Sequence, residues 1–307
     1  MPTPLNSRTH DWTILKLLQW TTGYFLTHHI DSPRVTAEIL LSHALNLRRI
    51  DLYLQYDQPL SKPELASFKL LIQRRINREP VAYITGKKAF WSLDLDVNPN
   101  VLIPRPDTEC LVETALQQIP VLSNTNATCI PMKILDIGTG SGAVILSLAH
   151  ERPGHLYCAT DLSWQAILTA KQNSHHHNLG DQILFVQSDW LTAFKPGKCR
   201  FDMIVCNPPY IPTADIDTLQ PEVFQYEPRM ALDGDIDGLN AYRMILDQSR
   251  HVLATQGRLL LEMGWDQKEL ILNLCRLFPE YGNVRVILDD AGHDRVVELI
   301  RNQRTEK

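Results

Sequence analysis

From Met132 onward the chain alternates short apolar runs with helical segments, and this alternation restricts the possible fold more than any other feature of the sequence. Strands separated by helices are typical of a parallel sheet with helices on both faces. We predict strands at Ile134–Ile137, Leu156–Thr160, Ile183–Val186, Phe201–Cys206, Arg258–Met263, Val284–Leu288 and Val296–Ile300. The predicted fold class is therefore α/β, with a doubly wound, mostly parallel, seven-stranded sheet within residues 101–307.

The first 78 residues show a helical pattern instead, and we predict a small all-helical domain over residues 1–78. Apolar residues recur at helical spacing in two runs, Ala37–Leu45 and Leu65–Ile76. Ser32 before Pro33 predicts the start of the first helix, and Ser61 with Glu64 predicts a capping box for the second. The basic cluster Arg74, Arg75 and Arg78 indicates a solvated helix face, or a contact with an acidic partner or RNA.

Residues 79–100 change to an alternating pattern, which predicts a linking β-hairpin between the two domains. We expect Val81–Thr85 to pair with the strand from Trp91 to Val97 around Gly86. Asp107 is expected to cap the helix that follows, and residues 120–131 are expected to form a loop.

Composition limits the functional classes. The formal net charge of −5 argues against a protein that holds nucleic acid mainly through its phosphates, and we expect no stable nucleic-acid partner. The six cysteines have no paired spacing, so we predict reduced thiols and a cytoplasmic protein. No apolar run reaches membrane-spanning length and the N-terminus lacks the pattern of a signal peptide, so we expect no membrane partner.

A glycine-rich turn, Asp136-Ile137-Gly138-Thr139-Gly140-Ser141-Gly142, links the first predicted strand to its helix. Such a turn lets the backbone approach a ligand at a helix N-terminus, and its spacing fits both NAD and S-adenosylmethionine. Asp161, which follows the second strand, is placed to bind ribose hydroxyls in either case, or to cap the next helix. The packed glycines after an acidic residue, and the end of the fourth strand, favour S-adenosylmethionine.

The fourth predicted strand ends in Asn207-Pro208-Pro209-Tyr210. The two prolines stiffen the backbone, so that the side-chain oxygen of Asn207 and the carbonyl of Pro208 can accept both hydrogens of one –NH2 group. Tyr210 can stack on a flat substrate group. These features predict methyl transfer to a planar nitrogen, with Asn207, Pro208 and Tyr210 as the catalytic residues. A strand-end turn with a buried tyrosine is the structural alternative.

Two further residues follow the third strand. Asp189 is expected to accept from an adenine amino group and Trp190 to cover its ring, or Trp190 is a core tryptophan.

Two patterns that resemble metal sites lack the ligands that a metal needs. The run from Asp233 to Gly238 imitates a calcium loop but has Met244 at its twelfth position, and His175–His177 has no acidic or thiol partner at ligand spacing. We therefore predict no metal.

The chain resembles the release factor glutamine methyltransferases, a family of class I S-adenosylmethionine-dependent enzymes with a Rossmann-like sheet. Besides the two motifs, the resemblance rests on five stretches, 79–86, 90–91, 102–109, 226–229 and 292–296. It implies N5-methylation of the glutamine in the Gly-Gly-Gln motif of class I peptide chain release factors, with S-adenosylhomocysteine as the other product. By the same analogy, the cofactor would contact Gly138, Thr139, Gly140, Ser141, Gly142, Asp161, Asp189, Trp190 and Asn207, and the glutamine would contact Asn207, Pro208, Pro209 and Tyr210.

Two rival functions remain open at the level of sequence: an N6-adenine methyltransferase acting on DNA or RNA, since Asn-Pro-Pro-Tyr occurs there too, and a non-catalytic nucleotide-binding protein. The helical domain holds no candidate nucleophile or base, so we expect it to recognise the protein substrate. No strong base is evident beside Asn207 in the sequence, so the proton is expected to leave to water.

Overall fold

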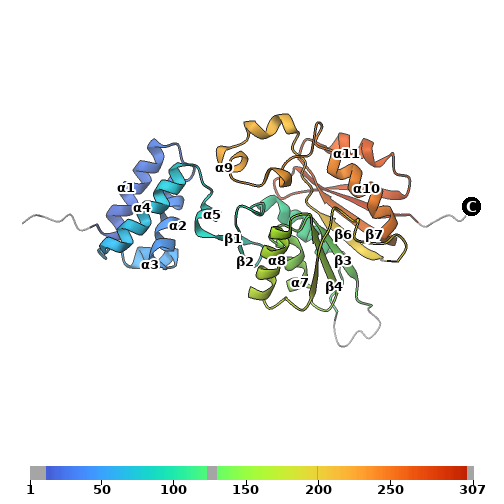
Figure 1. The fold of residues 1–307 in the computed structure, drawn as a ribbon, viewed down its shortest axis with the longest axis horizontal. Helices are drawn as coiled ribbons and strands as arrows, with labels where there is room; N and C mark the ends of the chain where they lie inside the picture. The colour runs from blue at the N-terminus through green and yellow to red at the C-terminus, as the bar shows by residue number, and fades with distance from the viewer. Residues whose placement is uncertain (1–11, 123–129, 199, 303–307) are drawn as a thin grey trace, which may run out of the picture. The chain divides into compact units, whose positions relative to one another are not determined.

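The computed structural model describes residues 12–122, 130–198 and 200–302. The chain divides into two compact units, Met1–Gly86 and Lys87–Lys307, and each is described by itself (Figure 1). The predicted loop of residues 120–131 falls largely on residues outside this description.

The first unit is helical, as the sequence predicts. Its helices are α1 (Ile14–Thr27), α2 (Pro33–Leu45), α3 (Arg49–Leu54), α4 (Lys62–Ile76) and α5 (Val81–Thr85). The capping box of α4 is confirmed, because Ser61 accepts from the Glu64 N–H and Glu64 accepts from the Ser61 N–H. The predicted cap of α2 is wrong in one respect. The helix does begin at Pro33, but Ser32 has a φ of 46° and its side chain makes no capping hydrogen bond.

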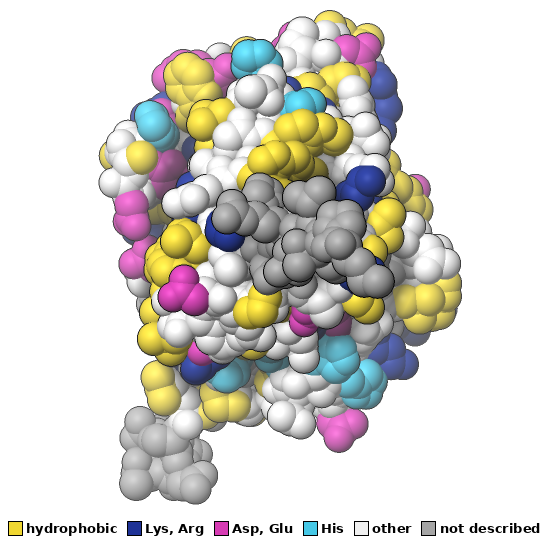
Figure 2. Space-filling view, turned by 90° about the vertical axis from the view of Figure 1, so that its left-hand side faces the viewer, with side chains coloured by type: hydrophobic (Ala, Val, Ile, Leu, Met, Phe, Trp, Pro, Cys, Tyr) yellow, Lys and Arg dark blue, Asp and Glu magenta, His cyan; other side chains and the backbone are white. Residues whose placement is uncertain are grey.

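The surface of the helical unit carries several large apolar side chains, among them Trp20, Leu26 and Leu54. Figure 2, which looks at the molecule from the left-hand side of Figure 1, shows hydrophobic side chains at several places between uncharged ones. The basic cluster at the end of α4, however, is not a solvated face. Arg74 donates to Glu79 at 2.7 Å, Arg75 is 5% exposed, and Arg78 donates to the His29 carbonyl at 3.0 Å. These arginines hold the unit's own loops.

The predicted pairing of Val81–Thr85 as a strand is wrong, because these residues form the short helix α5. The Ile84 N–H donates to the Pro80 carbonyl at 3.0 Å, and Gly86 ends the helix with a φ of 72°. Pro80, Tyr83 and Ile84 are buried at the i, i+3, i+4 spacing of one helix face, which explains why the helix forms in place of a strand. The hairpin lies just beyond, with β1 (Lys87–Phe90) antiparallel to β2 (Leu93–Asp96).

The second unit contains the predicted seven-stranded sheet, with strand order β5-β4-β3-β6-β7-β9-β8. Its strands are β3 (Lys133–Ile137), β4 (Leu156–Asp161), β5 (Ile183–Gln187), β6 (Phe201–Cys206), β7 (Leu253–Glu262), β8 (Tyr281–Leu288) and β9 (Asp294–Arg301). The first five are parallel, whereas β9 pairs antiparallel with both β7 and β8. The predicted fold class is thus confirmed.

Helices cover both faces of this sheet (Figure 1). The cluster that contains Ile134, Met203 and Leu260 also contains residues of α6 (Glu109–Leu116) and α7 (Ala143–Glu151). The cluster on the other face contains Leu135, Ile204 and Leu259 with residues of α10 (Asn240–Val252) and α11 (Lys268–Cys275). Successive strand residues therefore face opposite layers, which fixes the face of every side chain at the strand ends.

The remaining elements lie before or between these strands: η1 (Pro106–Thr108), α8 (Trp164–His176), η2 (Thr213–Thr218), α9 (Pro221–Phe224) and η3 (Arg229–Ala231). Ser163 caps α8 by accepting from the Ala166 N–H at 3.2 Å. Within the described ranges, no helix is both long enough and apolar enough to cross a membrane.

Candidate active site

The glycine-rich turn after β3 opens its backbone toward a cavity. Gly138 and Gly140 have φ values of 69° and 58°, and a Cβ added at either would meet nothing within 4 Å. The turn therefore leaves space at the backbone where a ligand can approach closely. Gly142 differs, because a Cβ there would come within 2.9 Å of Leu146. It starts α7 with a φ of 86° and is not among the residues that line the cavity.

Asp161, at the end of β4, shapes the neighbouring loop. Its Oδ2 accepts from the Gly140 N–H at 2.9 Å and its Oδ1 accepts from the Ser163 N–H at 2.8 Å. Burial raises the pKa of this carboxyl group, while the backbone donors lower it. The carboxylate also lines the cavity, so it can hydrogen-bond a ligand hydroxyl while it orders the glycine turn.

A second carboxylate, Asp136, lies beneath the turn. It is 2% exposed and accepts from the Thr139 hydroxyl at 2.7 Å. Burial, together with the nearby Asp161 charge, raises the pKa of Asp136 to about 7. Asp136 therefore holds the start of the turn through Thr139, while Asp161 holds its middle.

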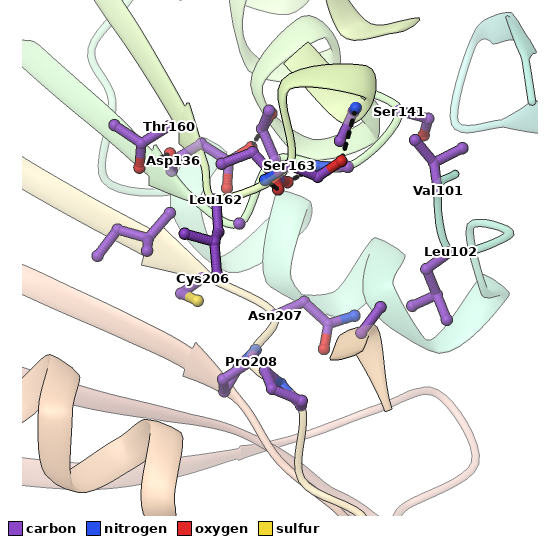
Figure 3. Close-up of a pocket in the computed structure, with 18 of the residues that line it drawn as sticks. Val101, Leu102, Asp136, Ser141, Thr160, Leu162, Ser163, Cys206, Asn207 and Pro208 are labelled. Atoms are coloured by element: carbon purple, nitrogen blue, oxygen red, sulfur yellow. Dashed lines mark hydrogen bonds between the residues drawn. The ribbon is translucent and has the colours of Figure 1, made fainter. Parts of the chain in front are cut away.

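Most of the predicted site residues line one cavity between the ends of β3, β4 and β6 (Figure 3). Those that do are Gly138, Thr139, Gly140, Ser141, Asp161, Asp189, Trp190, Asn207, Pro208 and Pro209. Asp189 is exposed and Trp190 half-buried, with a φ of 48° at the tryptophan. Four stretches far apart in the sequence thus meet at the carboxyl edge of the sheet, where α/β folds bind ligands.

These residues fit an adenosine-containing cofactor. The open glycines leave space for close approach of a ligand to the backbone, and Asp161, Asp189 and Trp190 line the same cavity. The donor set does not suit a metal. Within the described residues, no group of three or more His, Cys, Asp or Glu side chains is arranged to hold one.

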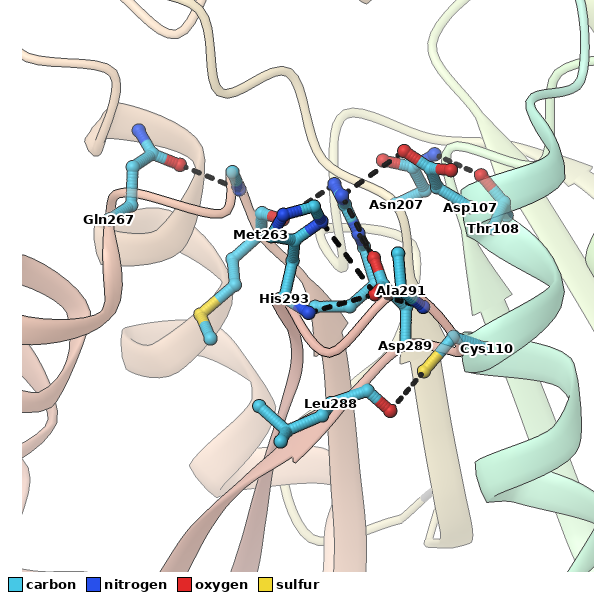
Figure 4. A network of polar contacts seen from close by, with 12 residues as sticks. Asp107, Thr108, Cys110, Asn207, Met263, Gln267, Leu288, Asp289, Ala291 and His293 are labelled. Atoms are coloured by element: carbon cyan, nitrogen blue, oxygen red, sulfur yellow. Dashed lines mark hydrogen bonds and ion pairs between the residues drawn. The ribbon is translucent and has the colours of Figure 1, made fainter.

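Asn207 has a fixed orientation at the end of β6. Its Nδ2 donates to the hydroxyl of Thr108 at 3.1 Å (Figure 4). Since the amide nitrogen is engaged in this way, the amide oxygen is the atom left to accept from a group in the cavity. Asn207 and Pro208 line two neighbouring cavities, and Tyr210 lines only the second one.

Glu262, at the end of β7, was not singled out by the sequence. It is 1% exposed and lines the second cavity together with Asn207, Pro208 and Tyr210. A buried carboxylate therefore lies beside Asn207, and the sequence analysis did not foresee it. A signal was present, since a carboxylate directly follows the apolar run Leu259–Leu261 in a predicted parallel strand, next to the strand that ends in Asn207.

Three of the stretches that carry the family resemblance, 102–109, 226–229 and 292–296, hold this edge of the sheet together. Glu227 pairs with Arg105 and also accepts from the Ile103 N–H at 3.0 Å. Arg295 pairs with Asp107 and with Asp289, each at 3.1 Å (Figure 4). The prediction that Asp107 caps the following helix is wrong, because Asp107 lies inside η1 and its carboxylate is used by Arg295.

Residues from later in the chain fix the loop that follows Asn207. Gln267 donates to the Tyr210 carbonyl at 2.9 Å and accepts from the Gly264 N–H at 3.0 Å. Gly238 packs against the same carbonyl, where a Cβ would come within 2.4 Å. The Asn-Pro-Pro-Tyr turn is thus fixed by prolines within it and by partners around it.

This sheet order, the open glycine turn and the strand-end Asn-Pro-Pro-Tyr define a class I S-adenosylmethionine-dependent methyltransferase. The PrmC N-terminal domain profile matches residues 16–86, and the methyltransferase small domain profile matches residues 119–227. The chain is 42% identical over 289 residues to the release factor glutamine methyltransferase of Geobacter sulfurreducens, covering 93% of this chain and 96% of that protein. It therefore belongs to the release factor glutamine methyltransferase family.

Other relatives agree. The release factor glutamine methyltransferase of Salmonella typhimurium is 42% identical over 266 residues, with 87% of this chain and 91% of that protein covered. Among solved structures, the catalytic domain of hMettl16 in complex with the MAT2A 3′UTR hairpin 6 aligns with a TM-score of 0.53 at 17% identity. That alignment covers 79% of this chain and 82% of the other, and it supports the fold alone.

Proposed function

We propose that this chain methylates the side-chain amide nitrogen, N5, of the glutamine in the Gly-Gly-Gln loop of class I peptide chain release factors. The donor is S-adenosylmethionine, the other product is S-adenosylhomocysteine, and no metal takes part. Family membership supports the reaction, and one geometric observation supports the role of the site. The Asn207 amide is held by Thr108 with its oxygen left for a donor in the cavity.

The chemistry requires such a site because an amide nitrogen is a poor nucleophile, its lone pair being delocalised. Two acceptors, the Asn207 oxygen and the Pro208 carbonyl, hold both hydrogens of the amide and raise the electron density on its nitrogen. They also orient the lone pair, and both effects grow as positive charge develops on nitrogen. Bound S-adenosylmethionine supplies an electrophilic methyl group on its sulfonium sulfur.

The remaining site residues divide between binding and orientation. Gly138–Ser141, Asp161, Asp189 and Trp190 hold the cofactor in the first cavity. Tyr210 borders the second cavity, where its ring can pack on the planar amide. Burial raises the pKa of Tyr210 to about 12, so its hydroxyl stays protonated and does not act as a base.

The helical unit, matched over residues 16–86 by the PrmC N-terminal profile, is proposed to recognise the body of the release factor. A single glutamine offers few contacts, so a second surface would supply much of the affinity. A cytoplasmic location belongs to the same proposal, since termination of translation takes place there. The net charge of −5 supports the absence of a stable nucleic-acid partner.

Mass spectrometry of a release factor incubated with the protein and S-adenosylmethionine tests the proposal directly. We expect one added methyl group on the glutamine of the Gly-Gly-Gln loop, and none with the Asn207→Ala variant. Parallel reactions with labelled cofactor use DNA and RNA as acceptors. Label in nucleic acid but not in the release factor would overturn the assignment of the substrate.

A further inference from the structure

Glu262 occupies the position on β7 that corresponds to Asn207 on β6. The two strands are parallel, and Cys206 pairs with Leu261, so each of the two side chains comes one residue beyond that pair. Alternation places both on the face covered by α6, since Val205 and Leu260 belong to that layer. The helix start on this face carries Thr108, the partner of Asn207.

The backbone of Glu262 is fixed on both sides. The Tyr242 hydroxyl donates to the Glu262 carbonyl at 2.8 Å, and the Met263 N–H donates to the Arg295 carbonyl at 2.8 Å. The side chains of Thr108 and Asn207 lie close to the Glu262 carboxylate and lower its pKa. Its Oε2 atom, although buried, has no partner. A buried acceptor without a partner destabilises the ionised carboxylate and favours uptake of a proton.

The charge of Glu262 is set by groups on several elements. Burial, together with the charge of Asp107, raises its pKa to about 7 against the lowering effects of Thr108, Arg295 and Asn207. The other titratable groups that sense its charge are Cys110, Cys206, Tyr210 and Tyr242. Asp107 is engaged by Arg295, and Tyr210 remains protonated. Among the described residues that line the second cavity, Glu262 is the only carboxylate.

We propose that Glu262 is a catalytic residue, whose carboxylate receives the proton that the substrate amide loses on methylation. This inference rests on the proposed function. The nitrogen lone pair forms the N–C bond while the C–S bond breaks and its electron pair stays on sulfur. The nitrogen, now positively charged, gives up one of the two hydrogens that Asn207 and Pro208 hold. The proton passes to the Glu262 carboxylate, and the N–H electron pair restores the conjugation of the amide. Glu262 passes the proton to water when the product leaves.

The location of the carboxylate also suits the movement of charge in this step. Positive charge leaves the sulfur in the first cavity and appears on nitrogen beside Asn207 and Pro208, which both cavities share. A fixed negative charge on the nitrogen side stabilises that displacement before the proton moves. Both effects require Glu262 to be ionised.

The test is the pH dependence of single-turnover methylation of a release factor at saturating cofactor. In the parent protein we expect the rate to rise with pH through the pKa of Glu262 and then to level off. Glu262→Gln is nearly isosteric and should lower the plateau by about 10²–10⁴-fold and remove this rise. Its affinity for S-adenosylhomocysteine, measured by calorimetry, should match that of the parent.

The matched control is Glu298→Gln. Glu298 is also 1% exposed and lies on the neighbouring strand β9, but both its oxygens pair with arginines, Arg258 and Arg285. This variant should keep the parental pH profile even if it loses stability. A readout without turnover is the 13C carboxyl resonance of Glu262, which should titrate in the same pH range as the rate. Formate should partly restore the rate of Glu262→Ala by entering the vacated space.

A Glu262→Gln rate within a few-fold of the parent, or one that keeps the parental pH profile, would overturn the role of Glu262. A carboxyl resonance that titrates far from the rate would do the same without any variant. These failures differ from a failure of the proposed function. In that case the parent protein itself transfers no methyl group to a release factor at any pH.

Discussion

The two sides of the active edge are built in different ways. On the cofactor side, a continuous turn and the next strand end do the work, and much of it is backbone: Gly140 donates to Asp161, and Gly138 leaves open space. On the acceptor side, Asn207 depends on side chains from separate stretches, Thr108 before α6 and Glu262 after β7. One side is local in sequence, whereas the other is assembled by the fold.

This difference predicts that the two sides fail differently. Damage to the cofactor side should weaken binding, because its groups contact a ligand in its ground state. Damage to the acceptor side should lower the rate, because its hydrogen bonds strengthen as charge develops on nitrogen. The predictions below test this separation.

The largest effect is expected for Asn207→Ala. The variant removes an acceptor for the substrate amide and leaves one N–H unpaired, so the single-turnover rate should fall by at least about 10²–10³-fold. Asn207→Asp should also lose a large part of the rate, since the atom that donates to Thr108 becomes an acceptor oxygen. Cofactor affinity, measured by calorimetry, should stay within a few-fold.

Asn98→Ala is the matched control for that experiment. The Asn98 amide also donates to a threonine hydroxyl, Thr169, at 3.0 Å, but Asn98 lines neither cavity. Its rate should equal that of the parent. If Asn207→Ala also keeps the parental single-turnover rate, the hydrogen-bond account of the acceptor side is wrong.

The opposite pattern is expected for Asp161→Ala. Removing two charge-assisted bonds to the loop, together with the ribose acceptor, should lower the affinity for S-adenosylhomocysteine by roughly 10- to 100-fold. At saturating cofactor the methyl-transfer rate should largely recover. Asp189→Ala should have a smaller effect, because its exposed carboxylate already competes with water. A rate defect in Asp161→Ala that persists at saturation would contradict the separation.

The comparison also explains how far the sequence could be interpreted. The seven strands, the glycine turn and the Asn-Pro-Pro-Tyr turn each depend on neighbouring residues, so local patterns predicted them. The sequence analysis missed Thr108 and Glu262 as partners of Asn207, because their contact depends on which strands are neighbours and on which face each side chain lies. Asp107 was assigned to a helix cap for the same reason: its true partner, Arg295, is far away in the sequence.

Local patterns also gave wrong predictions where the same pattern fits two different structures. Val81–Thr85 has the β-branched composition of a strand, yet it forms a helix, in which Pro80, Tyr83 and Ile84 are buried at the i, i+3, i+4 spacing of one helix face. The arginines after Ile72 look like a solvated face, but their partners, Glu79 and the His28–His29 carbonyls, are brought to them by turns.

A moderate effect is expected for Thr108→Val. The change keeps the shape of the side chain but removes the acceptor of the Asn207 Nδ2, so the Asn207 amide is oriented less firmly. One lost hydrogen bond of this kind corresponds to a fall of about tenfold in the single-turnover rate. Cofactor affinity serves as the internal control. A rate equal to that of the parent would show that the two prolines of the turn alone orient the Asn207 amide.

The smallest effect concerns stability, and it compares one buried carboxylate from each side. Burial raises the pKa of both Asp136 and Glu262 to about 7, above their values in the unfolded chain. The folded protein therefore binds these protons more tightly, and each group costs stability as pH rises from about 4.5 to 7. Glu262→Gln should thus raise the melting temperature by several degrees at pH 8, with little change at pH 4.5. Asp136→Asn should show a gain at least as large, because the pKa of Asp136 is raised to the same value from a lower starting point. Melting curves at the two pH values measure both gains. A Glu262→Gln variant that is less stable than the parent at pH 8 would show that the ionised carboxylate is well compensated in the free protein.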